Sequence, residues 1–226
     1  MSVRLRLVAL CLLAVFSAAC GSSSSSSTTV SLRIVQASPD APASKILIDG
    51  TSVASNAVYG NNTGYQSVKV GSRHIQLIPI GGSSTIFDQT VSVSSTADQT
   101  LLLTGAASAI KPVLLNDGGT TSTTGDGHVR VINVALGITA ADVYIVPAGT
   151  GTAGVTPIAP NVGFDGNTGY QLTAIGNYEV VFTTPGSPSS ALLDTGPLGL
   201  TQGQNQTVLA LDGASGGFNY TVLTDQ

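Results

Sequence analysis

Charge, aromatic rings and thiols are all scarce in this sequence. Only 9% of its 226 residues are charged and 5% are aromatic, tryptophan is missing, and Glu179 is the single glutamate. The two cysteines, Cys11 and Cys20, both lie near the beginning of the chain. No thiol is left further along for a disulfide, a metal site or a nucleophile, so we expect the folded part to be held together by packing alone.

A hydrophobic run long enough to cross a membrane is also missing. The longest apolar stretch, residues 7–16, has roughly ten residues, about half of what a spanning helix needs. It follows Arg4 and Arg6 and ends in small residues. This is the pattern of a secretory signal.

The residues that follow the apolar run predict a lipid anchor. Ser-Ala-Ala-Cys at residues 17–20 resembles the bacterial lipobox, in which the cysteine is acylated and becomes the first residue of the mature protein. We therefore predict a signal peptide over residues 1–19, lipid attachment at Cys20 and a flexible Ser-rich tether over residues 20–29. Ser17 stands where leucine is most frequent, so cleavage before the cysteine without lipidation stays open.

The expected location is the cell envelope. Gly21, rather than aspartate, after the cysteine resembles lipoproteins that are sent to the outer membrane of a Gram-negative bacterium. Removal of Arg4 and Arg6 leaves six basic residues against twelve acidic ones, a net charge of −6. This balance disfavours nucleic acid as a partner. The expected partners are the membrane, through the lipid, and an envelope protein or glycan.

The remainder of the chain consists of two similar units. Asn-Thr-Gly-Tyr-Gln occurs at residues 62–66 and again at residues 167–171. The surrounding similarity predicts one unit over residues 30–119 and another over residues 128–226, joined by a Thr-, Ser- and Gly-rich linker over residues 120–127.

Equivalent segments can be matched between the units on both sides of this pentapeptide. Residues 32–36 match residues 129–133, and near the ends residues 99–103 match residues 206–210. Among the last residues of each unit, we match Val113-Leu114 with Val222-Leu223. What both units keep is expected to serve the fold.

Short β-strands are the predicted elements of both units. Residues 31–36 and 89–93 alternate polar and apolar side chains, and Gly-containing turns separate such runs. The continuous apolar runs at residues 101–103 and 209–211 are typical of strands buried on both sides. About seven strands in roughly ninety residues predict an all-β fold of two tandem immunoglobulin-like antiparallel β-sandwich domains.

The first unit resembles a known family. Residues 32–43, Leu-Arg-Ile-Val-Gln-Ala-Ser-Pro-Asp-Ala-Pro-Ala, and residues 46–50 are similar to the opening signature of domain of unknown function 4397 (DUF4397), a family of exported β domains. The second unit resembles it more weakly through residues 141–145 and 168–170, which suggests two tandem copies in a bacterial lipoprotein. The second unit replaces Ser-Pro-Asp-Ala-Pro by residues 135–139. The resemblance implies an envelope location and a β-sandwich, with no catalytic residues to transfer.

Four residues are candidates for ligand binding. Asp40, between two prolines, could bind a cation or a sugar hydroxyl, or could instead accept backbone hydrogen bonds in its loop. Tyr59, Tyr144 and Tyr178 would have to be exposed to form the aromatic platform of a glycan-binding surface. The insert at residues 148–160, which only the second unit carries, is a further place for specific binding.

Catalysis and metal binding find little support in the sequence. His74 and His128 have no second His or Cys at ligand spacing. No Gly-x-Ser-x-Gly motif with a placed histidine is present. We therefore predict no enzyme activity and no cofactor. The favoured function is a non-catalytic envelope lipoprotein that serves as an interaction or spacer module, and the alternative is a carbohydrate- or glycan-binding surface module.

Overall fold

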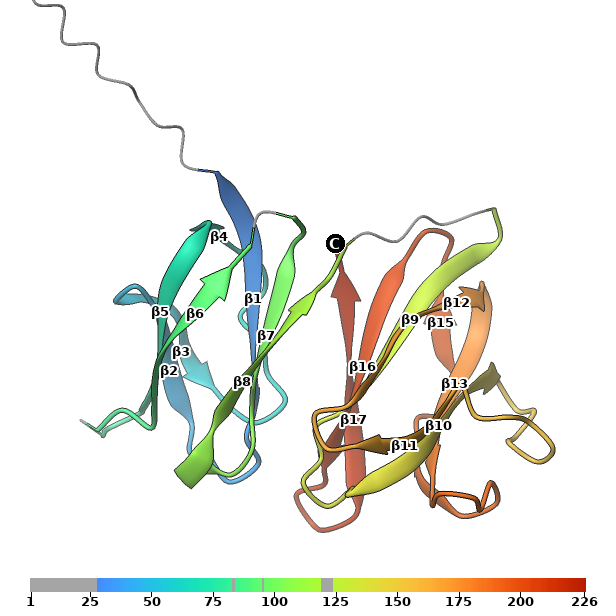
Figure 1. Ribbon diagram of the computed structural model, residues 1–226. Helices are drawn as coiled ribbons and strands as arrows, with labels where there is room; N and C mark the ends of the chain where they lie inside the picture. The colour runs from blue at the N-terminus through green and yellow to red at the C-terminus, as the bar shows by residue number, and fades with distance from the viewer. Residues whose placement is uncertain (1–27, 83, 95, 119–123) are drawn as a thin grey trace, which may run out of the picture.

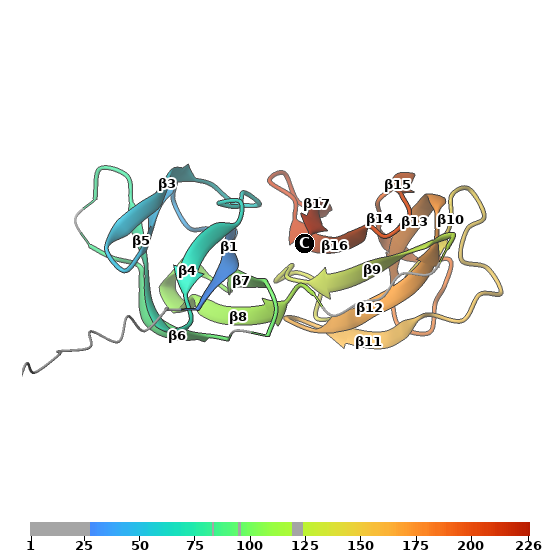
Figure 2. The same cartoon turned by 90° about the horizontal axis from the view of Figure 1, so that it is seen from above.

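Two β-sandwiches lie side by side and make up nearly all of the described chain (Figures 1 and 2). The structure, a computed structural model, describes residues 28–82, 84–94, 96–118 and 124–226. The predicted signal peptide and Cys20 lie outside these residues, as do residues 120–123 of the predicted linker. Residues 126 and 127 of that linker belong instead to the first strand of the second sandwich.

The first sandwich contains eight strands in two sheets. In sheet order, the inner sheet consists of β4 (Gln66–Lys69), β1 (Thr29–Ala37), β7 (Gln99–Thr104) and β8 (Lys111–Asn116). The outer sheet consists of β3 (Thr51–Ala57), β2 (Ser44–Ile48), β5 (Gly71–Pro79) and β6 (Phe87–Val93). A single 3₁₀ turn, η1 (Ala107–Ala109), lies between β7 and β8.

The second sandwich repeats this strand order. Its inner sheet consists of β12 (Asn167–Ala174), β9 (Asp126–Asn133), β16 (Asn205–Asp212) and β17 (Phe218–Asp225). Its outer sheet consists of β11 (Ala159–Gly163), β10 (Ala140–Pro147), β13 (Gly176–Thr183) and β14 (Ala191–Asp194), with β15 (Leu198–Leu200) also paired to β13. In the second sandwich, β15 pairs with the beginning of β13 and β14 pairs with its end. In the first sandwich, the single strand β6 occupies this edge.

The all-β sandwich prediction is confirmed, with one addition to the strand pairing. Most neighbours are antiparallel, but β1 runs parallel to β7 and β9 runs parallel to β16. Parallel pairs are usually covered on both faces. Every residue of β7 is buried, which agrees with the prediction from its continuous apolar run.

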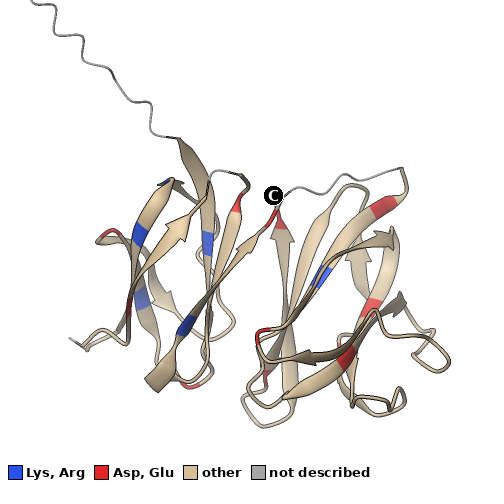
Figure 3. Cartoon of the chain, viewed as in Figure 1, with Lys and Arg blue, Asp and Glu red and all other residues tan. Residues whose placement is uncertain are grey.

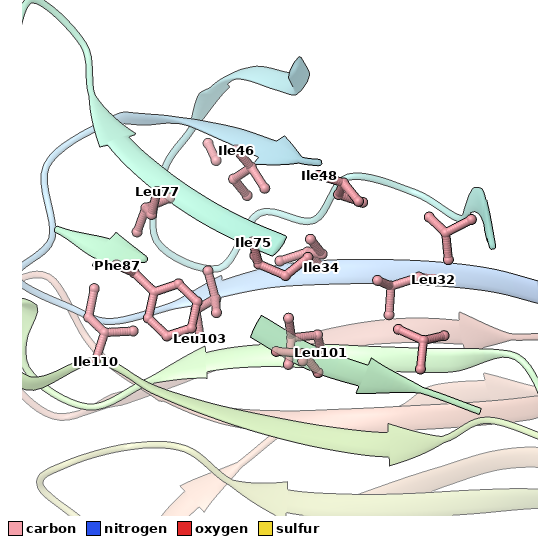
Figure 4. Packing of buried hydrophobic residues seen from close by; sticks show 14 residues of the cluster. Leu32, Ile34, Ile46, Ile48, Ile75, Leu77, Phe87, Leu101, Leu103 and Ile110 are labelled. Carbon is pink, nitrogen blue, oxygen red and sulfur yellow. The ribbon is translucent and has the colours of Figure 1, made fainter. Parts of the chain in front are cut away.

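Each sandwich has its own hydrophobic core between its two sheets. In the first, Leu32 and Ile34 of β1 belong to one cluster of buried side chains with Ile46 of β2 and Ile75 and Leu77 of β5 (Figure 4). In the second, Phe182 is fully buried at the corresponding place. Period-two alternation therefore places every second residue of the inner strands in these cores.

The opposite faces of the two inner sheets pack against each other. A third cluster joins Val35, Leu102 and Leu115 of the first sandwich to Ile132 and Leu209 of the second. The molecule consequently has four layers: an outer sheet, two inner sheets in contact, and another outer sheet (Figure 1). The apolar runs are buried on both sides because Leu101 and Leu103 enter a core while Leu102 enters the interface.

The structure corrects the sequence match between the last strands by one residue. Gln99 pairs with Asn116, and its counterpart Gln206 pairs with Thr224. Leu114-Leu115 is therefore equivalent to Val222-Leu223, in place of Val113-Leu114.

Candidate functional site

The most strongly organised polar group of the molecule lies in the interface between the sandwiches. Arg33 on β1 reaches across to the second sandwich, where its Nη2 donates to Asp225 Oδ1 at 2.5 Å and its Nη1 donates to the carbonyl of Thr224 at 2.9 Å. Within its own sheet the same guanidinium donates to the hydroxyl of Thr100, at 2.7 and 3.0 Å. All three guanidinium nitrogens of Arg33 thus donate hydrogen bonds.

The second sandwich repeats this arrangement in the opposite direction. Arg130 on β9 donates to Asp117 Oδ1 at 2.7 Å and to the carbonyl of Asn116 at 2.8 Å, both in the first sandwich. It also donates to the hydroxyl of Thr207 on its own sheet at 2.8 Å. The two ion pairs cross the interface as a reciprocal set, and charges are otherwise sparse on both sandwiches (Figure 3).

Two tyrosines complete the set. The guanidinium carbons of Arg33 and Arg130 lie 4.6 and 4.5 Å from the ring centroids of Tyr65 and Tyr170, which is cation–π geometry. The Tyr65 hydroxyl donates to Asp117 at 2.8 Å, and the Tyr170 hydroxyl donates to Asp225 at 2.7 Å. Burial raises the pKa of both phenols.

The repeated Asn-Thr-Gly-Tyr-Gln segment places these tyrosines. In the first copy, the Asn62 side chain accepts from the backbone N–H of Gly64, and the Thr63 hydroxyl accepts from the N–H of Ile34 on β1. Gly64 has φ +66°, a conformation that suits glycine. The second copy repeats both hydrogen bonds, from Gly169 N–H to the Asn167 side chain and from Val131 N–H to the Thr168 hydroxyl. Gly169 has φ +64°. The pentapeptide is thus the turn that fixes Tyr65 beside Arg33.

The cluster is closed to solvent. The side chains of its two arginines and two aspartates are at most 5% exposed, and both aspartate side chains are 0% exposed. Burial raises the pKa of Asp117, against the opposing effects of Thr100 and Arg130. Because no ligand reaches these carboxylates, the arrangement fixes the position of one sandwich on the other.

An open groove lies on the second sandwich, beside the predicted insert. It has a volume of about 290 Å³ and lies between β12, the end of β10 and the beginning of β13, with Ile158 of the insert in its wall. Leu172 is 60% exposed and Ile175 is 46% exposed at its rim. Its lining carries no charged side chain.

The equivalent place on the first sandwich has a different chemistry. A groove of about 410 Å³ there is lined by the charged side chains of Asp49, Lys69 and Arg73, by uncharged polar side chains such as Gln66, and by three apolar ones. Arg73 donates to Asp49 at 2.8 Å. The two sandwiches therefore share an architecture and differ in what this surface presents.

Asp40 is held by its own loop. Its Oδ1 accepts from the backbone N–H of Ala107 at 2.7 Å, at the beginning of η1, and from the Ser38 hydroxyl at 3.5 Å. This matches the structural alternative that the sequence left open for Asp40.

The three candidate tyrosines do not form an aromatic platform. Tyr144 and Tyr178 are each 2% exposed, and the Tyr178 hydroxyl donates to the buried Gln206 side chain at 2.6 Å. Tyr59 packs against the inter-sandwich cluster, and its oxygen accepts from the N–H of Asp212 in the other sandwich at 2.8 Å. Burial raises the pKa of Tyr59 to about 12.

The described residues contain no group of three His, Cys, Asp or Glu side chains placed to hold a metal ion. In the same residues no helix is long and apolar enough to span a membrane.

Sequence reasoning missed the polar interface cluster. Arg33 and Arg130 were matched as equivalent, yet nothing in a single strand shows that an arginine faces a second sheet. The sequence signal that could have indicated the interface is that both units keep an Arg, a Tyr, a Thr and an Asp at equivalent positions. The one-residue slip in the last strand concealed it by misaligning Asp117 and Asp225.

Comparison with known proteins places the chain in a family. The family described as "Domain of unknown function (DUF4397)" matches residues 30–144, which is the first sandwich together with β9 and the first part of β10 in the second. The chain belongs to the DUF4397 family. For this DUF4397 protein, no match is found among curated proteins.

Two solved structures are distantly similar to the DUF4397 chain. One is a family CBM26 carbohydrate-binding module of Eubacterium rectale Amy13K in complex with maltoheptaose, at 13% identity and a TM-score of 0.30, covering 87% of this chain and 98% of that one. Another is the Bacillus anthracis TIE protein, at 11% identity and a TM-score of 0.24, covering 87% of this chain and 44% of that one. At these scores neither carries an inference about a ligand.

Proposed function

We propose that this chain is a non-catalytic lipoprotein of the bacterial cell envelope whose two sandwiches act as one rigid spacer and interaction module. The observation that carries the proposal is the interface, where an apolar cluster and two crossed Arg–Asp pairs join the inner sheets. A rigid body on a Ser-rich tether suits a protein that presents a surface at a distance from its membrane. The matching strand orders support a second, diverged DUF4397 domain over the second sandwich.

Rigidity is tested by a distance measurement. Cysteines introduced at Thr90 and Ala191 lie at exposed positions on the two outer sheets and accept spin labels. In residues 21–226, which contain no other cysteine, a single narrow distance distribution between the labels is expected. A broad distribution would contradict the spacer proposal.

The proposed lipid anchor and outer-membrane location are tested in cells. A clickable fatty acid should label the wild-type protein and the Cys11→Ala variant, but not Cys20→Ala, because Cys11 belongs to the signal. Labelled protein should fractionate with the outer membrane. Unlabelled wild type would instead support cleavage before Cys20 without lipidation.

The absence of catalysis is proposed from the environment of the acidic residues. The two carboxylates of the interface, Asp117 and Asp225, are enclosed by arginine, threonine and tyrosine donors. A general acid or base must reach its substrate, and these side chains are 0% exposed.

Glycan binding is the second candidate function. It no longer draws support from Tyr144 and Tyr178, which are buried, but the polar groove around Asp49, Gln66 and Arg73 offers hydrogen-bonding groups to a hydroxylated ligand. A glycan array probed with wild type and with Arg73→Ala tests it. Binding that Arg73→Ala abolishes would favour this candidate, whereas no binding by wild type would remove it.

A further inference from the structure

The two faces that meet in the interface carry the same side chains at equivalent positions. Each has an arginine on its first strand, a threonine on the neighbouring parallel strand, and an aspartate just after or at the end of its last strand: Arg33, Thr100 and Asp117 in one, Arg130, Thr207 and Asp225 in the other. Each arginine bonds its own threonine and the aspartate of the opposite face. Each aspartate in turn accepts from its own threonine at 2.5 Å.

Each face therefore carries both partners of the Arg–Asp ion pair. It offers one arginine to the opposite sheet and one aspartate to the opposite arginine, which is the condition for a self-complementary, isologous contact. The apolar part is similarly matched, since Val35, Leu102 and Leu115 stand where the other face has Ile132, Leu209 and Leu223. A first sandwich that met another first sandwich would bring Arg33 opposite Asp117.

We propose that this inner-sheet face is a self-pairing surface whose partner is a second copy of this chain. Two chains pair by opening their internal interfaces and re-forming them between molecules, sandwich against sandwich. The Arg–Thr–Asp set with its tyrosine determines which surfaces match. A surface that places a like charge opposite the arginine or the aspartate cannot pair with this face, because the contact would bury two unpaired charges.

The closed monomer competes with this pairing. The two sandwiches are joined by the short connection from β8 to β9, and a short linker gives an effective concentration on the order of mM. Intermolecular pairing in the wild type is therefore confined to comparable concentrations. A variant whose own two faces repel each other loses this competition at far lower concentrations.

Charge reversal in one sandwich provides the test. In Arg130→Glu/Asp225→Lys, the closed form sets Arg33 against a lysine and Asp117 against a glutamate, while two first sandwiches still match. Light scattering on residues 21–226 should give the mass of one chain for wild type and of two chains for the variant, at about 100 µM, well below the linker's effective concentration. Adding Arg33→Glu and Asp117→Lys restores opposite charges across the closed interface and should return the monomer.

A folded two-residue variant, judged by circular dichroism, that stays monomeric would overturn the proposal. If that variant does not fold, the wild type decides the matter. Refolded from denaturant at about 1 mM, near the effective concentration of the linker, it should yield a dimer that is missing after refolding at about 1 µM. Failure to find the dimer at the higher concentration would equally overturn the proposal.

Discussion

The Asp117 carboxylate accepts three side-chain hydrogen bonds in the interface, as many as its counterpart Asp225. It accepts from Arg130 at 2.7 Å, from Thr100 at 2.5 Å and from Tyr65 at 2.8 Å, with its side chain 0% exposed. Removal of one partner of a buried ion pair leaves the other charge buried and unpaired, at a cost of about 3–5 kcal/mol. We expect Asp117→Ala to lower the free energy of unfolding by about that amount in urea titrations.

Asp88 provides the matched control for this substitution. It also bonds to a basic side chain, that of His74, but the Asp88 side chain is 53% exposed on the outer sheet. Exposed pairs contribute little because water solvates both partners. Asp88→Ala should leave the urea midpoint nearly unchanged, and equal effects of the two substitutions would show that burial is not the cause.

The tyrosines predict a loss of stability at alkaline pH. Burial raises the pKa of Tyr59 to about 12, and it also raises the pKa values of Tyr65, Tyr170 and Tyr178. In the unfolded chain tyrosine titrates near pH 10, so above that pH the unfolded state releases protons that the folded state retains. Stability is therefore fully present below about pH 10 and falls as the pH rises toward about 12.

Denaturant titrations between about pH 8 and 12, followed together with tyrosinate absorbance, check this dependence. Tyr178→Phe should reduce the steepness of the decline by roughly one proton per molecule. An unfolding free energy that stays constant over this interval would contradict the assigned role of burial.

At the scale of elements, the duplicated turn depends on glycine for its backbone conformation. Gly64 and Gly169 have φ values of +66° and +64°, and an added Cβ would meet nothing within 4 Å at either position. The cost of alanine is therefore backbone strain alone, about 1–2 kcal/mol at each site. Thermal or urea unfolding of Gly64→Ala and Gly169→Ala should show this loss.

Gly199 separates strain from the mere addition of a methyl group. It lies in β15 with equally open space around its Cα but without a left-handed φ. Gly199→Ala should be tolerated, and a loss there as large as at Gly64 would indicate that crowding or chain entropy, and not φ, governs these turns.

The strands were predictable because their signals are local. Alternation, glycine turns and the apolar run at residues 101–103 predicted elements that the structure contains. The parallel pairing of β1 with β7 was not predictable, since it joins residues that are 67 positions apart, such as Leu32 and Gln99. Register was the most fragile step: a slip of one residue moves every side chain of a strand to its other face.

At the scale of the whole molecule, the candidate sites were only partly accessible from the sequence. The insert was predicted as a place of difference between the units, and Ile158 from it lines the apolar groove. The interface was not predicted because Arg33 alternates with apolar residues as any exposed strand residue would. Arg33 is only 3% exposed because the inner sheet of the second sandwich covers it, and no local sequence pattern indicates that covering sheet.

Leu101 and Leu102 test whether the two sandwiches are energetically one body. Both are 0% exposed on β7, but Leu101 belongs to the first core and Leu102 to the cluster between the sandwiches, together with Leu209. Each leucine-to-alanine change should lower the free energy of unfolding by about 2–5 kcal/mol.

Residues that share a packed cluster show coupling of about 0.5–3 kcal/mol in a double-mutant cycle, whereas separate sites are additive. Urea unfolding should therefore show coupling for Leu102→Ala with Leu209→Ala and additivity for Leu101→Ala with Leu209→Ala. Additivity in both cycles would mean that the sandwiches touch without stabilising each other.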